Sequence, residues 1–273
     1  MSDSQPYNFD VRAYVEGDVL GRHPCLEEAL CSAICNDLYQ KHVSRGSSLR
    51  ILDIGAANGD FTEKLVQRIE RDLSMDRRHI TTFKVDPFGD HHKHDIIRLD
   101  GELFCGVMPS NHIDIVVAKA VIHFFKDFAS WLKNVTRILK PGGSVYIVNM
   151  AHDAAFPWGE EAQSSYATSV IGDGYAWMTA KRPLPPADGD EEGDADVVHH
   201  VVHSLVTLGK DSWIWFIRNR SWSNLQKLSD AALQRTVAFV ENEYRDREQI
   251  NFVMRWNMSV IHKKRSKVIR AKL

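Results

Sequence analysis

The segment Asp53-Ile54-Gly55-Ala56-Ala57-Asn58-Gly59 combines a carboxylate with a turn of small residues. A carboxylate at the end of an apolar strand needs hydrogen-bond donors or a cation to offset the cost of its desolvation. The glycines and alanines keep side chains out of the turn, so backbone N–H groups can approach a ligand closely. This pattern predicts a ligand-binding loop, with an ordinary connection between a strand and a helix as the alternative.

The spacing of the glycines bears on the kind of ligand. The dinucleotide fingerprint GxGxxG requires a glycine in the middle, where this chain has Ala57. A carboxylate two residues before the first glycine also suits a positively charged ligand group better than a pyrophosphate. An NAD-type oxidoreductase is therefore disfavoured, although it stays a rival interpretation on a similar sheet.

Two further residues follow predicted strands and could do chemistry. Asp86 ends an apolar run and precedes Pro87. In a doubly wound sheet, an acidic residue at this point can accept hydrogen bonds from both ribose hydroxyls, although Asp before Pro is also an ordinary turn. His123 follows the predicted strand 112–118, and its neutral imidazole could take a proton from a reacting group; packing beside a ligand is the alternative.

Strands and amphipathic helices alternate along the chain and would position these groups. The hydrophobic pattern predicts strands at 49–54, 80–85, 96–99, 112–118, 144–150, 197–208 and 249–261. It predicts helices at 25–42, 62–73, 126–139 and 230–244, with a helical turn at 213–217. The expected fold is α/β: a doubly wound, Rossmann-like seven-stranded sheet, mostly parallel with an antiparallel last strand.

Several segments, in this order, resemble motifs of the class I S-adenosylmethionine-dependent methyltransferases. They are Leu52–Gly59, Asp86, Ala118–Phe125 and the Leu-Lys-Pro-Gly-Gly run at 139–143. The C-terminal third is more loosely similar to small-molecule enzymes of the trans-aconitate methyltransferase-like group. The resemblance implies S-adenosyl-L-methionine as cofactor and a small-molecule acceptor methylated on oxygen, nitrogen or sulfur. A non-catalytic methyltransferase-like subunit is a further rival.

The resemblance also implies roles for particular residues. Asp100 would accept a hydrogen bond from the adenine amino group. Apart from the resemblance, a carboxylate acceptor needs no base, whereas for a phenol, thiol or amine the candidate base is His123, followed by His152 or His203. The complete set of cofactor-binding candidates is Asp53, Gly55, Ala56, Ala57, Asn58, Gly59, Asp86, Pro87, Asp100, Gly101, Lys119 and Ala120.

Substrate contacts are expected from an N-terminal lid and from aromatic residues between 156 and 177. The candidates are Tyr14, Trp158, Tyr166, Trp177 and Arg220. Rigid rings can shape a ligand pocket, but rings at this spacing also serve as plain core. Arg220 could clamp a carboxylate, whereas anchoring of its own helix is the structural alternative, and the favoured one.

The chain is predicted to be a single methyltransferase domain over 1–273. Its expected parts are a lid and helical segment at 1–45, a cofactor-binding core at 46–150 and a substrate-side insertion at 151–212, which contains an acidic loop at 182–196. C-terminal helices and the last strand follow at 213–264, and a basic tail at 265–273.

Composition excludes several classes of function. The formal net charge of -2 provides no field that would favour nucleic acid, and no apolar run has membrane-spanning length. Four cysteines without a CxxC pair and the irregular histidines at 91–94 predict no metal site. A cytoplasmic protein is expected, or a peroxisomal one if the C-terminal Ala-Lys-Leu acts as an address; the oligomeric state is left open.

Overall fold

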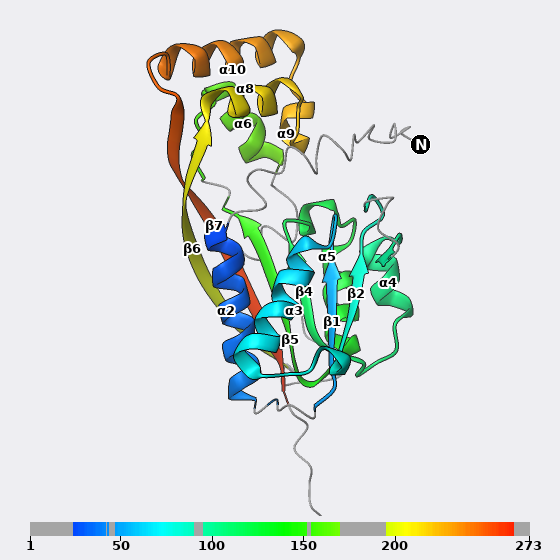
Figure 1. Cartoon of the computed structure of the whole chain (residues 1–273). Coiled ribbons are helices and arrows are strands. Elements are labelled where there is room, and N and C mark those ends of the chain that lie inside the picture. The colour runs from blue at the N-terminus through cyan, green and yellow to red at the C-terminus, as the bar shows by residue number, and fades with distance from the viewer. Residues whose placement is uncertain are drawn as a thin grey trace, which may run out of the picture. The chain divides into compact units, whose positions relative to one another are not determined.

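The computed structural model describes residues 24–41, 43, 47–89, 95–151, 154–169 and 195–264 (Figure 1). The chain folds into two compact units. Of the described residues, the larger unit holds 24–154, 195–204 and 254–264, and the smaller unit holds 155–169 and 205–253. The single domain over 1–273 and its subdivisions stay predictions.

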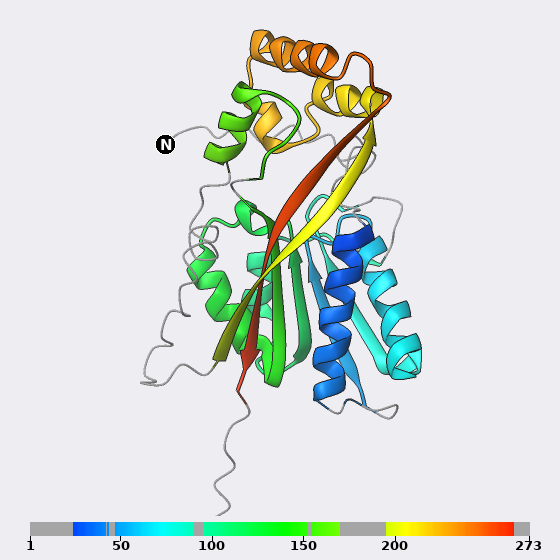
Figure 2. The ribbon, with the colours of Figure 1, turned by 90° about the vertical axis from the view of Figure 1, so that its left-hand side faces the viewer.

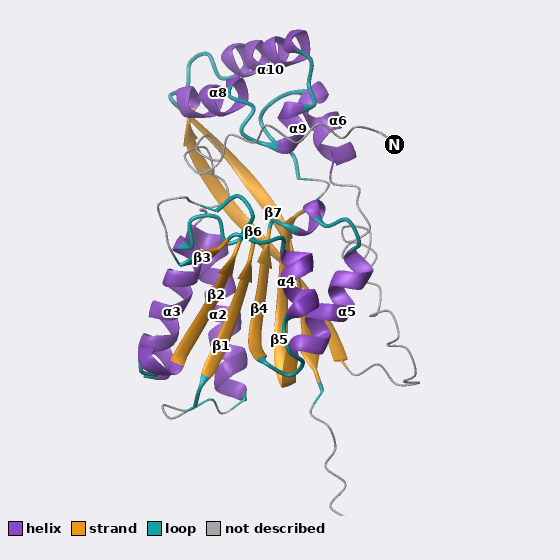
Figure 3. Cartoon of the chain, turned by 90° about the vertical axis from the view of Figure 1, so that its right-hand side faces the viewer, coloured by secondary structure: helices purple, strands orange, loops and turns teal. Residues whose placement is uncertain are grey.

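One sheet of seven strands forms the centre of the larger unit (Figure 3). Its order is β3 (Ile96–Ile97), β2 (Ile80–Val85), β1 (Leu49–Ile54), β4 (Ile113–Lys119), β5 (Leu139–Met150), β7 (Gln249–Lys263) and β6 (Ala195–Gly209). The pairs from β3 to β5 are parallel, and β7 runs antiparallel to β5. The predicted fold class is therefore confirmed. The strand order reverses between β1 and β4, which is where doubly wound sheets bind ligands.

Helices cover both faces of the parallel part of the sheet (Figure 1). One face carries α2 (Pro24–Gln40) and α3 (Asp60–Leu73), and the other carries α4 (Gly101–Val107) and α5 (Phe128–Ile138). Helix α3 buries Phe61, Leu65 and Ile69 at helical spacing, which explains why this segment packs on the sheet. Apolar side chains of α5 pack with Val145, Ile147 and other strand residues into one core.

Three predicted boundaries moved for local reasons. Strand β3 is two residues long because the chain turns away at exposed Arg98. Helix α5 begins at Phe128 because the Asp127 side chain caps it by accepting a hydrogen bond from Ser130 N. Strand β5 begins at Leu139, before the Pro-Gly-Gly run, because Leu139 already pairs with Ile113 and the register then shifts.

The described part of the smaller unit, 155–169 and 205–253, consists of four helices together with the adjoining ends of β6 and β7. The helices are α6 (Glu160–Ser169), α8 (Lys210–Arg218), α9 (Ser223–Gln226) and α10 (Asp230–Glu243). Its core is aromatic, with Trp158 and Trp213 stacked at a centroid distance of 5.6 Å and Phe156 against Trp158 at 4.6 Å. Strands β6 and β7 both continue from this unit into the other (Figure 2).

Within the described ranges, none of the helices combines the length and apolar character needed to cross a bilayer. The same ranges hold no group of three or more His, Cys, Asp or Glu side chains arranged to bind a metal. The tripeptide Ala-Lys-Leu at 271–273 lies outside the described residues.

Candidate active site

The loop after β1 owes its shape to three residues with left-handed backbone. Gly55, Ala57 and Gly59 have φ angles of 74°, 51° and 77°. A Cβ atom added to Gly55 would lie 2.8 Å from Val121 Cβ, so only glycine fits there. The glycines are therefore required by both the turn and its packing. The N–H groups of Gly55 and Ala56 donate to Val85 O, and that of Gly59 donates to Ala56 O, so the turn is held by its own backbone.

Asp86 connects this loop to the end of β2. Its Oδ2 atom accepts a hydrogen bond from Ala57 N at 2.9 Å, and Oδ1 accepts one from Phe88 N at 2.8 Å. Burial raises the pKa of Asp86 above its usual value, against the two backbone hydrogen bonds. Each carboxylate oxygen retains a lone pair for a further donor. The side chain can thus accept hydrogen bonds from two neighbouring hydroxyls while it holds the loop.

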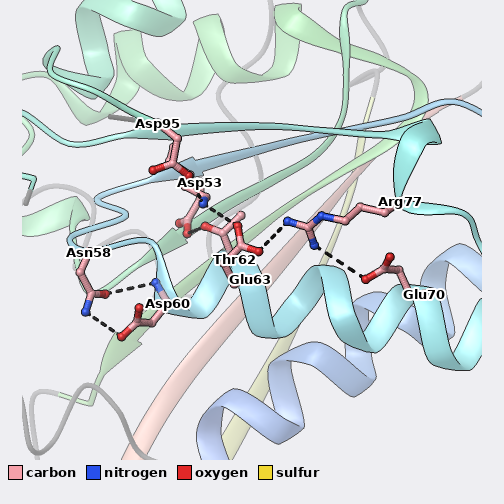
Figure 4. Close-up of polar contacts among 9 residues, drawn as sticks. Asp53, Asn58, Asp60, Thr62, Glu63, Glu70, Arg77 and Asp95 are labelled. Atoms are coloured by element: carbon pink, nitrogen blue, oxygen red, sulfur yellow. Dashed lines mark hydrogen bonds and ion pairs between the residues drawn. The ribbon is translucent and has the colours of Figure 1, made fainter. Parts of the chain in front are cut away.

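Asp53 is almost completely buried below the loop, at the end of β1 (Figure 4). Its Oδ2 accepts a hydrogen bond from Thr62 Oγ1 at 2.5 Å. Burial raises the pKa of the Asp53 carboxyl to about 6, although the Thr62 hydrogen bond and the Lys119 charge act in the opposite direction. Asn58 lies on the other side of the turn, where its Nδ2 donates to Asp60 Oδ2 at 2.7 Å. A carboxyl group whose pKa is raised toward neutral pH is typical of functional sites.

A buried lysine with more exposed carboxylate partners lies against the loop and was not predicted from the sequence. Lys84 Nζ lies 2.6 Å from Glu63 Oε1 and 2.5 Å from Asp95 Oδ2, and its side chain is 4% exposed. A Cβ atom on Gly59 would lie 2.9 Å from Lys84 Cδ. Glu63 also pairs with Arg77 (Figure 4). A lysine within the apolar run of β2 was the available signal.

Asp100 and Gly101 lie where the chain enters α4. The Asp100 side chain caps this helix by accepting hydrogen bonds from Glu102 N at 2.8 Å and Leu103 N at 3.3 Å. Gly101 packs against β1, since an added Cβ would meet Ile54 Cγ2 at 2.4 Å. Asp86 N donates to Ile97 O at 3.0 Å, which links this region to the loop. The structure thus brings the ends of β1, β2 and β3 to one edge.

The end of β4 carries the remaining candidates of the larger unit. Lys119 Nζ lies 3.2 Å from Glu27 Oε1, and Glu27 was not predicted as a site residue. Ala120 has a left-handed backbone with φ 54°, and its N–H donates to Val148 O. His123 is exposed in the short 3-10 helix Ile122–Phe124, with its ring 4.0 Å from that of Phe124.

A buried amide at the end of β5 was also missed by the sequence analysis. Asn149 is 3% exposed, and within the described chain neither its Oδ1 nor its Nδ2 has a hydrogen-bond partner. Burying an amide without hydrogen-bond partners costs about 1–3 kcal/mol, so packing alone does not explain an asparagine at this position.

The predicted substrate residues that are described lie in the smaller unit and have structural partners. Trp158 and Tyr166 are buried in its aromatic core, as the plain-core alternative expects. Arg220 Nη1 donates to the carbonyls of Leu225 and Leu228, and Nη2 lies 2.5 Å from Asp230 Oδ1. These contacts favour the anchoring interpretation of Arg220.

The other candidates for contact with the acceptor are three residues outside the described part of the chain and one exposed histidine. Tyr14, His152 and Trp177 lie outside the described residues, and His203 is exposed on β6. The catalytic and substrate assignments of these residues therefore stay predictions.

Comparison with known proteins gives a family for the chain. A family model described as a methyltransferase domain matches residues 26–182, more than half of the chain. A highly reducing polyketide synthase of Pyrenophora dematioidea is 28% identical over 120 residues, which are 40% of this chain and 5% of that protein. Fusarielin synthase FSL1 of Gibberella zeae is 28% identical over 185 residues, 57% of this chain and 7% of the synthase. The chain thus spans a small part of these relatives.

Among solved structures, a putative methyltransferase from an antibiotic biosynthesis pathway of Anabaena variabilis is similar, with 14% identity and a TM-score of 0.48. The match covers 87% of this chain and 98% of that one. Because the family model includes the loop after β1, Asp86 and the end of β4, it covers every residue of the candidate cofactor edge. The chain belongs to the methyltransferase domain family.

Proposed function

We propose that this chain transfers the methyl group of S-adenosylmethionine to a small molecule, with the carboxyl edge of β1 to β4 as the site. The observation that carries the proposal is Asp86, whose oxygens hold Ala57 N and Phe88 N and still have lone pairs for two ribose hydroxyls. The small-residue loop and the buried Asp53 suit the cationic methionine part.

For methyl transfer, the protein must chiefly align the acceptor with the methyl group and exclude water, rather than activate a bond. Bound S-adenosylmethionine supplies a methyl group already activated by its sulfonium. A bond forms between the acceptor atom and the methyl carbon while the carbon–sulfur bond breaks, and S-adenosylhomocysteine leaves. We assign to His123 the role of the base that takes a proton from the acceptor, because this imidazole lies in the 3-10 helix that follows β4. Asn149, at the end of β5, offers an amide to a polar acceptor.

Two acceptor classes follow from different observations. Similarity to the trans-aconitate methyltransferase-like group favours a small carboxylic acid, whose carboxylate requires no base. The matched segments of polyketide synthases favour a polyketide-type acceptor, in which an acidic carbon or a hydroxyl must lose a proton. A role for His123 would separate the two classes, because only the second depends on it.

Calorimetric titration with S-adenosylmethionine and, separately, with NAD tests the proposal. We expect micromolar binding of S-adenosylmethionine alone, followed by a gain of one methyl mass in an acceptor of either class. Binding of NAD alone would support the oxidoreductase. Cofactor binding without turnover on any acceptor would favour a non-catalytic subunit.

The raised pKa of Asp53 predicts that cofactor affinity depends on pH. The carboxyl is neutral below its pKa of about 6 and negatively charged above it. A cationic ligand prefers the charged form, so we expect the affinity to fall roughly tenfold from pH 7 to pH 5. Replacing Asp53 by asparagine should flatten this dependence in calorimetry, and Asp246→Asn, an exposed control, should preserve it. A pH dependence unaltered in Asp53→Asn would contradict the assignment.

The raised pKa of Asp53 also affects stability, and here the pH dependence has the opposite sign to that of cofactor affinity. The folded pKa of Asp53, about 6, lies above the ordinary aspartate value of 3.8, so the folded state retains its proton to higher pH. Its contribution to the free energy of unfolding is therefore largest at low pH and falls between about pH 4 and pH 6, by at most ~3 kcal/mol. Without ligand, Asp53→Asn should melt at least as high as the wild type at pH 7.5.

Asp86→Asn should weaken cofactor binding about tenfold, because the amide keeps one accepting oxygen, its nitrogen can only donate, and the negative charge is lost. Its Oδ1 can still accept from one backbone N–H, but Nδ2 would face the other one, so the melting temperature should also fall. Titration with adenosine gives an internal check, since the ribose loss should affect adenosine and S-adenosylmethionine alike. Unaltered affinity for both ligands would contradict the ribose role.

A further inference from the structure

A buried group of charges lies at the first turn of α2. The Glu27 side chain is 6% exposed, and its two oxygens carry different partners: Oε2 lies 2.6 Å from Lys64 Nζ on α3, and Oε1 lies 3.2 Å from Lys119 Nζ on β4. Burying a carboxylate is costly unless it is paired, and the gain from a pair usually does little more than offset the cost. Stability alone is therefore a weak reason for this arrangement.

The position of Lys119 places this group beside the ligand loop. Lys119 is the last residue of β4, and Val117, two residues earlier, pairs in register with Asp53 of β1. Residues two apart on a strand share a face, so Lys119 and Asp53 lie on the same side of the sheet. Lys119 Nζ is also 5.0 Å from the ring centroid of Phe61, in the first turn of α3 after the loop. The charges of Glu27 and Lys119 thus border the end of the loop that we assign to the methionine part.

Helix α2 is fastened at its other end, so the orientation of Glu27 is fixed. Asp37 Oδ2 accepts hydrogen bonds from Tyr146 Oη at 2.9 Å, Ser144 Oγ at 2.8 Å and Lys41 Nζ at 2.7 Å. Tyr146 and Ser144 belong to β5, and both are buried. The helix therefore presents Glu27 from a rigid support, which is what a binding group needs.

We propose that Glu27 and Lys119 form the subsite for the amino-acid end of the cofactor, with Lys119 paired to its carboxylate and Glu27 to its ammonium. A zwitterion carries both charges, so its binding replaces one protein ion pair by two mixed pairs and leaves no buried charge uncompensated. This inference rests on the proposed function only in the identity of the ligand. The competing possibility is that the pair merely ties α2 to the sheet.

Two ligands separate these possibilities. S-adenosylhomocysteine has the amino-acid end, and 5′-deoxy-5′-methylthioadenosine lacks it while retaining the adenosine and sulfur. We expect Glu27→Gln and Lys119→Met each to weaken S-adenosylhomocysteine binding about 10- to 30-fold in calorimetry. Both should leave the affinity for methylthioadenosine within about twofold. Lys64→Met is the matched control, because it removes the other ion-pair partner of Glu27. The Lys64 side chain is 53% exposed.

Each outcome is decisive. A selective loss for S-adenosylhomocysteine supports the subsite. An equal loss for both ligands, or a lowered melting temperature with no change in selectivity, would show that the pair only anchors α2. If the wild type binds S-adenosylhomocysteine and neither variant weakens it, the subsite is overturned while the proposed function stands. Failure of the wild type to bind either ligand would overturn the proposed function and the subsite together.

Discussion

Gly101→Ala should lower the free energy of unfolding by about 2–3 kcal/mol, because the added Cβ would lie 2.4 Å from Ile54 Cγ2. Ile54 is buried in β1 beneath the ligand loop and has no room to move away. Either α4 or β1 must shift, and a shift of β1 would displace the loop that follows it. We therefore expect both a fall in the melting temperature of roughly 5–10 °C and weaker cofactor binding.

Gly106→Ala, in the same helix, is the control. A Cβ at this position meets nothing within 4 Å. Alanine is the better helix former by about 1 kcal/mol, so this variant should melt at or slightly above the wild-type temperature. Chemical denaturation of both proteins measures the difference. Equal destabilisation by the two substitutions would show that helix α4, and not the contact with Ile54, is what tolerates no change.

His123→Ala should reduce turnover about 100-fold on an acceptor that must lose a proton, since general base catalysis typically contributes at least this much. The side chain is exposed in the 3-10 helix after β4, so its removal should leave the affinity for S-adenosylmethionine and the melting temperature nearly unchanged. The decisive readout is the pH profile of kcat, whose acidic limb should disappear with the imidazole.

His79→Ala provides a matched control, because His79 is also exposed and also lies in a 3-10 helix, at Arg77–His79. It should leave kcat and its pH profile unchanged. If His123→Ala abolishes cofactor binding, the side chain has a structural role at the site. If turnover is the same at every pH, the base assignment is wrong, and a carboxylate acceptor becomes the better candidate.

The central strands were predictable because their sequence pattern depends on burial. Strands β1 and β2 were predicted with their observed bounds, since β-branched and apolar residues predominate in both segments. The start of α10 was predictable for a different reason. Ser229 caps it by accepting a hydrogen bond from Ala232 N, which is a local interaction that a few neighbouring residues determine.

The ion pairs around the loop could not be predicted, because their partners are distant in the sequence. Lys119 and Glu27 are 92 positions apart, and Lys84 and Glu63 are 21 apart. Only the folded sheet brings them together. Trp158 illustrates a second limit: a large ring can line a pocket or fill a core, and the local pattern is the same in both cases.

The strand order β5-β7-β6 has a consequence for the biosynthesis of the protein. Strand β6 is made before β7 but lies outside it in the sheet, so a nascent chain that ends before residue 249 contains β6 without its neighbour. In that interval β5 and β6 each present an unpaired edge with exposed backbone donors and acceptors. The sheet can close only after the ribosome has released β7, and the incomplete chain is the species most prone to aggregate or to recruit a chaperone.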